Sequence, residues 1–358
     1  MGPPAKTPCP YCYQRECSSD DHIFLEAIGG KRTIRACKPC NDLFGHSFEG
    51  SAVANFFFPL LVTLRMAGVP VLDTGAKWRR AHVTEDGLVY NAVLDAGGYK
   101  LESTNVVVTR DDENPKIFRP ILGDDRVGRK HLRQFLDSGR FRLESMAERR
   151  LVDPREFNHD WGFNPDMKLT ALKMAFAVAN VAFPEELPGF AQPRAELIGA
   201  DLSAHPPSVA GDLRDHPSLD ALRDPLCHVI YVEQIGECIH AFVQFFGSVQ
   251  FCVVLKSRAS SLQTRGFIGR LDPVTGAESF SEVPALVLPP FRDCVVDAMV
   301  PIRKLNTAAV KRGSKVAEMI RLNEVRVDGV VVRSGKPYWV TSWTGDLSKK
   351  PQSSHSAD

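Results

Sequence analysis

The sequence predicts a mixed α+β protein in which a small cysteine-rich module precedes a larger α+β region. Three observations predict this class. Four cysteines form two close pairs within residues 9–40, and short β-type runs separated by turn residues fill residues 75–125. An apolar helix expected at 167–183 is followed by three strand-like runs. The 358 residues, 44% of them hydrophobic and 24% charged, are enough to form the cores of more than one domain.

We expect four segments along the chain. They are the cysteine-rich module at 1–62, a strand-rich connector with a basic helix at 63–165, an α+β domain at 166–345 and a disordered polar tail at 346–358. The finer expectations are a helix over 128–150, strands at 228–234, 239–246 and 249–255 with a hairpin step at 246–248, a turn at 272–276, a helix over 295–322 and a strand at 325–332.

The start of the chain carries no apolar leader, and two apolar stretches do not qualify as membrane spans. Prolines and an arginine interrupt residues 52–72, and residues 167–183 carry two lysines and are shorter than a span of about 20 residues. We therefore expect a soluble, cytoplasmic protein with no membrane partner. In that compartment paired cysteines favour a metal ion over disulfide bonds.

The two cysteine pairs predict a structural metal site. Cys9 and Cys12 form one Cys-x-x-Cys pair, and Cys37 and Cys40 form the other. Each pair can present two thiolates from one tight turn, and four thiolates complete the tetrahedral shell of a structural Zn²⁺ ion. Because so small a module buries little apolar surface, the zinc ion would supply much of its folding free energy. Zinc knuckles occur in binding modules as well as in enzymes, so the site alone does not define the function.

The residues between and after the cysteines form a second, more specific motif. The chain reads Asp21-His22-Ile23 after the first pair, then Gly29-Gly30, and Asn41 directly after the last cysteine. In this order and spacing the chain resembles the HNH endonuclease family, in particular the branch Cys-x-x-Cys, acidic-His-Ile, Gly-Gly, Cys-x-x-Cys-Asn. The resemblance covers residues 9–60 closely, and the rest of the chain is less specific.

The resemblance implies a ββα-metal fold and a site that hydrolyses phosphodiester bonds. It makes His22 the general base that takes a proton from the attacking water. It makes Asp21 and Asn41 ligands of a catalytic divalent ion, Mg²⁺ or Mn²⁺, which prefers such hard oxygen donors. The zinc ion would pin the strand pair to the helix and so fix these three side chains relative to one another.

The sequence departs from the family pattern in the second strand. In addition, individual residues of the motif have simpler structural interpretations. Many HNH domains have an asparagine in the second strand, but residues 31–36 contain none, so Thr33 or a backbone carbonyl would orient the His22 ring. His46 lies about 140° around a continuous helix from Asn41, which favours substrate contact over a shared metal. Taken singly, His22 could be a packed turn histidine and Asn41 a helix cap.

Charge supports nucleic-acid binding only locally. The formal net charge of the whole chain is +1, whereas residues 126–150 contain eight Lys or Arg against three Asp or Glu. Residues 301–350 contain eleven against four. Such segments are often only solvated faces, but beside a nuclease-like module they are the expected footprint for phosphate contacts. Arg142, Arg149 and Arg150 are the candidate contacts.

Two functions follow from the sequence. The first is a metal-dependent endonuclease that acts on nucleic acid, with DNA as the expected substrate. The second is a zinc-stabilised nucleic-acid-binding or regulatory protein whose nuclease site has decayed. The set Asp21, His22 and Asn41 discriminates between them, because a binding module has no need of a base beside a metal ligand.

Overall fold

The computed structural model divides the chain into two compact units. Unit 1 comprises Met1–Ala76, Ala96–Gly98 and Phe157–Gly329, and unit 2 comprises Lys77–Asp95, Tyr99–Glu156 and Val330–Asp358. The residues described are 7–66, 69–83, 87–95, 98–105, 107–110, 117–123, 126–138, 141–150, 164–201, 203–204, 206–211, 222, 224, 226–247, 249–256, 264–288 and 337–345. The cysteine-rich module thus shares one unit with most of the expected 166–345 domain, whereas most of the expected connector lies in the other.

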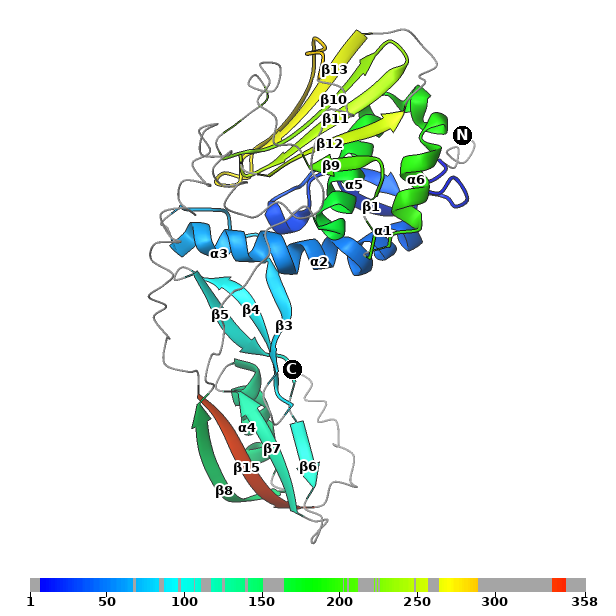
Figure 1. The fold of residues 1–358 in the computed structure, drawn as a ribbon. Coiled ribbons are helices and arrows are strands. Elements are labelled where there is room, and N and C mark those ends of the chain that lie inside the picture. Colours follow the sequence, from blue (N-terminus) through cyan, green and yellow to red (C-terminus); the bar gives the residue numbers. More distant parts are fainter. Residues whose placement is uncertain are drawn as a thin grey trace, which may run out of the picture. The chain divides into compact units, whose positions relative to one another are not determined.

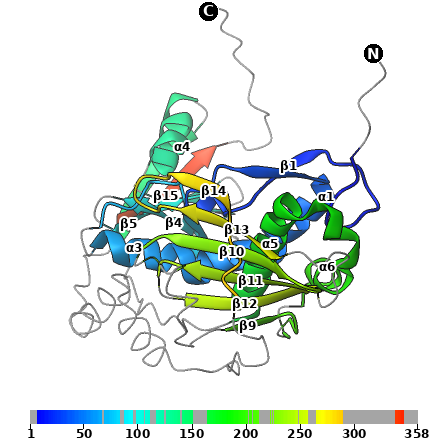
Figure 2. The same ribbon diagram turned by 90° about the horizontal axis from the view of Figure 1, so that it is seen from above.

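The described residues of unit 1 include a six-stranded antiparallel sheet. Its strands lie in the order β14 (Glu278–Val283), β13 (Thr264–Leu271), β10 (His228–Ile235), β11 (Cys238–Phe245), β12 (Val249–Lys256) and β9 (Val209–Gly211), as Figure 2 shows from above. The three expected strands are therefore confirmed as β10, β11 and β12. Phe246 and Gly247 have positive φ values of 51° and 64°, which gives the expected tight reversal between β11 and β12.

One buried helix supports this sheet. Helix α5 (Pro165–Ala182), the expected apolar helix, packs on β10 and β12 and lies between the sheet and the N-terminal helices (Figure 1). Every residue from Asp166 to Ala179 is buried, so the helix has no solvent-facing side. Charged residues on α5 must therefore find their partners inside the protein. The segment η4 (Pro184–Gly189) and the short helix α6 (Ala191–Ile198) follow α5 and pack beside it.

The cysteine-rich module is a strand pair followed by a long helical run. Strands β1 (Ser19–His22) and β2 (Thr33–Ala36) are antiparallel, and the 3-10 turn η1 (Glu26–Ile28) lies between them. The helical run comprises α1 (Lys38–Phe44), η2 (Gly45–Glu49), α2 (Gly50–Ala52), η3 (Val53–Phe57) and α3 (Phe58–Met66). Because η2 and η3 are π-helical, the continuous α-helix assumed for His46 is wrong.

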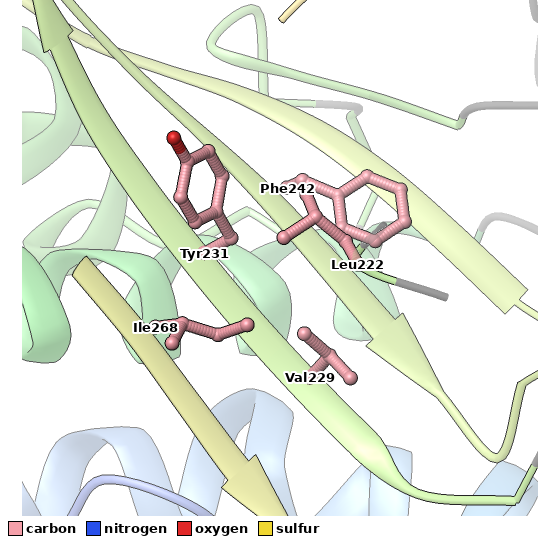
Figure 3. Packing of buried hydrophobic residues seen from close by; sticks show 5 residues of the cluster. All are labelled: Leu222, Val229, Tyr231, Phe242 and Ile268. Carbon is pink, nitrogen blue, oxygen red and sulfur yellow. The ribbon is translucent and has the colours of Figure 1, made fainter. Parts of the chain in front are cut away.

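The outer face of the sheet is closed by the chain that follows β14. Figure 3 shows Tyr231, Phe242 and Ile268 as neighbours in a buried cluster, which also contains Leu222 and Val229. The Glu233 carboxylate lies on the same strand face. It accepts the Tyr231 hydroxyl and the backbone N–H groups of residues 286, 287 and 288 at 2.6–3.0 Å. This buried acceptor holds the segment over the cluster.

In the residues that the structure describes, unit 2 contains two sheets and one helix. Strands β3 (Lys77–Val83), β4 (Val89–Asp95) and β5 (Gly98–Ser103) form one sheet. The other has the order β6 (Val107–Arg110), β7 (Ile117–Gly123), β15 (Pro337–Gly345) and β8 (Phe141–Arg150), and α4 is Arg126–Asp137. The strand-rich expectation for 75–125 is confirmed.

The helix expected over 128–150 is wrong in its second half. Helix α4 ends at Asp137, and residues 141–150 form strand β8, which pairs with β15 along its length. The partner strand lies about 190 residues further along the chain, so no local pattern could show the pairing. The elements expected at 295–322, 325–332 and 346–358 lie outside the described residues.

Candidate functional site in the cysteine-rich module

The four cysteines form one site that could hold a metal ion. The sulfur atoms of Cys9, Cys12, Cys37 and Cys40 all lie within 4.8 Å of one another. The Cys12 and Cys37 sulfurs are 3.8 Å apart. Sulfur atoms bound at about 2.3 Å around a tetrahedral zinc ion would be separated by ~3.8 Å. The spacing therefore fits the ion that the sequence predicts.

Local structure places the two pairs together. The Cys9 carbonyl accepts the Tyr13 N–H at 2.9 Å, which closes the turn that carries the first pair. The second pair stands at the start of α1, where Cys37 is the N-cap and Pro39 lies in the first turn. Burial raises the pKa of the Cys9 thiol to about 11 and also raises the pKa of Cys40. Such thiols stay protonated unless a cation binds them as thiolates, so metal binding would release protons.

The glycine pair of the motif forms a turn that only small residues allow. Gly29 has φ of +102° and ends η1, and a Cβ atom on Gly30 would lie 1.9 Å from the Phe24 carbonyl oxygen. The next two backbone N–H groups, of Lys31 and Arg32, donate to the Glu278 carboxylate at 2.9 and 2.8 Å. Strand β14 thus fixes the start of β2 from outside the module.

His22 ends strand β1 and is half-buried, so the residue is not sealed from solvent. The strand register places Thr33 directly opposite His22, which is one of the two groups that the sequence offers for orienting the ring. The backbone of His22 is fixed independently, because its carbonyl oxygen accepts the Lys173 ammonium at 2.6 Å. The candidate base is therefore held at an accessible edge of the strand pair.

Asp21 has a different environment from His22. Its side chain is only 2% exposed, and its two oxygens have separate partners. Lys173 on α5 lies 2.7 Å from Oδ1, and the Tyr11 hydroxyl donates to Oδ2 at 2.5 Å. Burial and the Asp21 charge raise the pKa of Tyr11, so the phenol remains a donor. Asp21 is the centre of a buried hydrogen-bonded ion pair.

Glu49 is the second carboxylate beside Lys173. Its Oε1 lies 3.0 Å from the Lys173 Nζ, without the alignment of a hydrogen bond. Burial raises the pKa of Glu49, and Lys173 opposes this effect. For Lys173, burial alone would lower the pKa, but Glu49 and Asp21 outweigh burial and raise it. Lys173 is therefore a charged ammonium with no exposed surface.

The remaining candidate residues of the module lie on the helical run. Asn41 is inside α1 rather than at its cap, and its side-chain NH₂ donates to the Asp20 carbonyl at 2.9 Å, which ties α1 to β1. His46 is exposed in η2, where its Nδ1 lies 2.6 Å from the Asp42 carbonyl oxygen. The substrate contact that the sequence suggests for His46 stays a prediction.

The arginine candidates belong to unit 2, whereas the cysteine-rich module belongs to unit 1. Arg142, Arg149 and Arg150 are all in strand β8, which forms an edge of its sheet. Arg142 is highly exposed and forms a loose ion pair with Glu144, at 3.8 Å. The three residues share one edge strand and not the helix on which the sequence had placed them.

Asp21 and Asn41 do not fit a catalytic divalent ion in this arrangement. Mg²⁺ and Mn²⁺ need several hard oxygen donors, with at least one carboxylate free to bind. Both Asp21 oxygens are already occupied by an ammonium and a phenol, and Asn41 adds at most one neutral oxygen. The four cysteines, in contrast, fit zinc without rearrangement.

Sequence reasoning missed Lys173, Glu49, Tyr11 and Glu278. Lys173 lies in an apolar helix that looks like pure core, and it is 152 positions from Asp21. A signal was nevertheless present, because a lysine that faces neither solvent nor a helix end needs a buried partner. Nothing local in the sequence could say which carboxylate that partner is.

The comparison with known protein families gives a match in the first part of the chain. Residues 9–57 match the HNH endonuclease family, which confirms the resemblance seen in the sequence. The match indicates a nuclease, and a nuclease acts on nucleic acid. No curated protein and no solved structure matches the chain. Among the described residues, no helix is both long enough and apolar enough to cross a membrane.

Proposed function

We propose that the protein is a zinc-stabilised endonuclease that hydrolyses phosphodiester bonds in DNA, with His22 as the general base. The observation that carries the proposal is the position of His22. It lies at the half-exposed end of β1, within the segment that matches the HNH family, and its backbone is fixed by Lys173. An imidazole held in this way can take the proton of a water molecule that attacks a phosphodiester.

One zinc ion in the Cys9, Cys12, Cys37 and Cys40 site would join the first turn to α1. This link supports the catalytic geometry, because β1 and α1 are also joined through Asn41 and the Asp20 carbonyl. The family resemblance implies Mg²⁺ or Mn²⁺ as the catalytic ion. Since both oxygens of Asp21 are engaged by Lys173 and Tyr11, the proposed role of His22 does not depend on an ion bound to Asp21.

The test is cleavage of supercoiled plasmid by the full chain in Mg²⁺, in Mn²⁺ and in EDTA. We expect His22→Ala to lower the rate by about 10²–10⁴-fold, the usual contribution of a general base. Zinc content should remain near one ion per chain. The matched control is Asp20→Ala, an exposed neighbour paired with Arg35, which should cleave like the parent. Equal rates for His22→Ala and the parent would show that the base is another residue.

The alternative is a zinc-stabilised nucleic-acid-binding protein with a decayed nuclease site. The engagement of Asp21 with Lys173 favours it, because that pair removes a ligand from the family's usual metal. A parent protein that binds DNA or RNA but cleaves neither in any divalent metal would establish this second function.

A further inference from the structure

The Lys173 ammonium lies in a cage of oxygen atoms. Its Nζ is 2.6 Å from the His22 carbonyl oxygen, 2.7 Å from Asp21 Oδ1 and 3.0 Å from Glu49 Oε1. Two of these three oxygens belong to carboxylates, and the Lys173 side chain is completely buried. Hard oxygens that converge on one point are the donors a divalent cation would use. Here the cation at that point is part of the polypeptide.

We propose that Lys173 is a fixed internal cation that takes the place of a divalent ion at the Asp21 carboxylate. Divalent ion binding by this protein is therefore independent of Asp21. Asp21 acts as a positioning residue that holds β1 against α5 and places the neighbouring His22. The inference concerns the site of the proposed nuclease, but it is tested by ion binding and not by cleavage.

Three features of the molecule support a fixed cation over one that a metal displaces. Residues on both sides of Lys173 along α5 are buried, so its side chain has no route to solvent within the helix. The second Asp21 oxygen is satisfied by Tyr11, whose ring packs at 4.8 Å on Phe44 and 5.3 Å on Phe176. Displacing the ammonium would leave a buried positive charge without a partner.

The experiment measures Mn²⁺ binding to zinc-loaded full-length protein by the loss of the free Mn²⁺ signal in electron paramagnetic resonance. Zinc remains at the cysteines, because thiolates bind it far better than they bind Mn²⁺. The variants are Asp21→Asn, Lys173→Met and the double variant Lys173→Met/Asp21→Asn. The matched control is Asp20→Asn, which changes the adjacent exposed carboxylate on the same strand.

We expect the parent, Asp21→Asn and Asp20→Asn to have the same Mn²⁺ binding curve, whether or not binding occurs elsewhere on the chain. Lys173→Met removes the ammonium and leaves its oxygen cage, so it should gain a Mn²⁺ site. The double variant should lose that gain, because Asp21 supplies one of the ligands. Zinc content and circular dichroism establish that each variant is folded.

A tenfold or greater loss of Mn²⁺ affinity in Asp21→Asn alone would overturn the proposal, because Asp21 would then be a metal ligand in the parent. A folded Lys173→Met protein that gains no site would overturn it too. If Lys173→Met does not fold, the comparison of the parent with Asp21→Asn decides the matter. A parent that cleaves no nucleic acid would refute the proposed function and leave these ion-binding results unaffected.

Discussion

Two buried basic side chains of unit 1 have opposite environments. Lys173 is surrounded by oxygen atoms and remains charged. His228, on β10, has no hydrogen-bond partner on either ring nitrogen within the described residues, and the Phe246 ring packs against it at 4.1 Å. Burial lowers the pKa of His228 to about 3. The folded protein therefore keeps this imidazole neutral under conditions in which the unfolded chain would protonate it.

We expect His228 to make the protein less stable in mild acid. Between its ordinary pKa of 6.5 and about 3, the unfolded chain binds a proton that the folded state does not. The stabilising contribution is therefore complete above pH 6.5 and is lost as the pH falls, by up to about 1.4 kcal/mol per pH unit. Urea unfolding from pH 5 to 8 should show a shallower loss in His228→Phe. An exposed control, His46→Gln, should follow the parent; equal slopes for all three would refute the assignment.

At the scale of elements, the Gly29–Gly30 turn shows which features the sequence could predict. The cysteine spacing predicted the metal site, because ligand spacing is local, and the turn residues and apolar runs predicted α5 and β10–β12 for the same reason. The sequence identified the glycine pair only as part of a motif. Its physical reason, the approach of Gly30 to the Phe24 carbonyl, depends on how the chain folds back on itself.

We expect Gly30→Ala to disrupt the module and Gly45→Ala to be tolerated. A Cβ atom at Gly30 overlaps a backbone oxygen, which cannot move without opening the turn, so unfolding free energy should fall by about 3 kcal/mol or more. A Cβ atom at Gly45 meets nothing within 4 Å, and alanine there favours the helix by up to about 1 kcal/mol. Zinc content and thermal unfolding measure both. A Gly30→Ala protein as stable as the parent would contradict the interpretation that a Cβ atom at this position overlaps the backbone.

At the scale of the whole molecule, the segment that matches the family is held by contacts with residues far along the chain. Residues 9–57 depend on Lys173 for charge balance and on the Glu278 carboxylate, which accepts two of their backbone N–H groups. Arg194 donates to the Pro10 carbonyl at 3.2 Å and stacks over Tyr13. These contacts span 150 to 250 positions, so neither a motif nor a periodicity could reveal them. The same limit explains why β8 was predicted as a helix.

We therefore expect a fragment of residues 1–76 to bind zinc without forming the native module. The fragment lacks the cation that balances Asp21 and Glu49, and it lacks Phe176, which covers Tyr11. Compared with the zinc-loaded full chain, it should show weak amide-exchange protection in β1 and α1. A fragment that is as well protected as the full chain would show that the module folds independently.

The partnership of Lys173 with Asp21 and Glu49 also has a consequence for synthesis. Both acidic residues leave the ribosome well before the lysine, because Lys173 lies 124 positions after Glu49. At a translation rate of about 5–20 residues per second, Lys173 is synthesised roughly 6–25 s after Glu49. During that interval zinc can bind to the cysteines before Lys173 is available to Asp21 and Glu49. The candidate site can be completed only after α5 has been synthesised, so synthesis of the later part of the chain sets the earliest time at which the site can form.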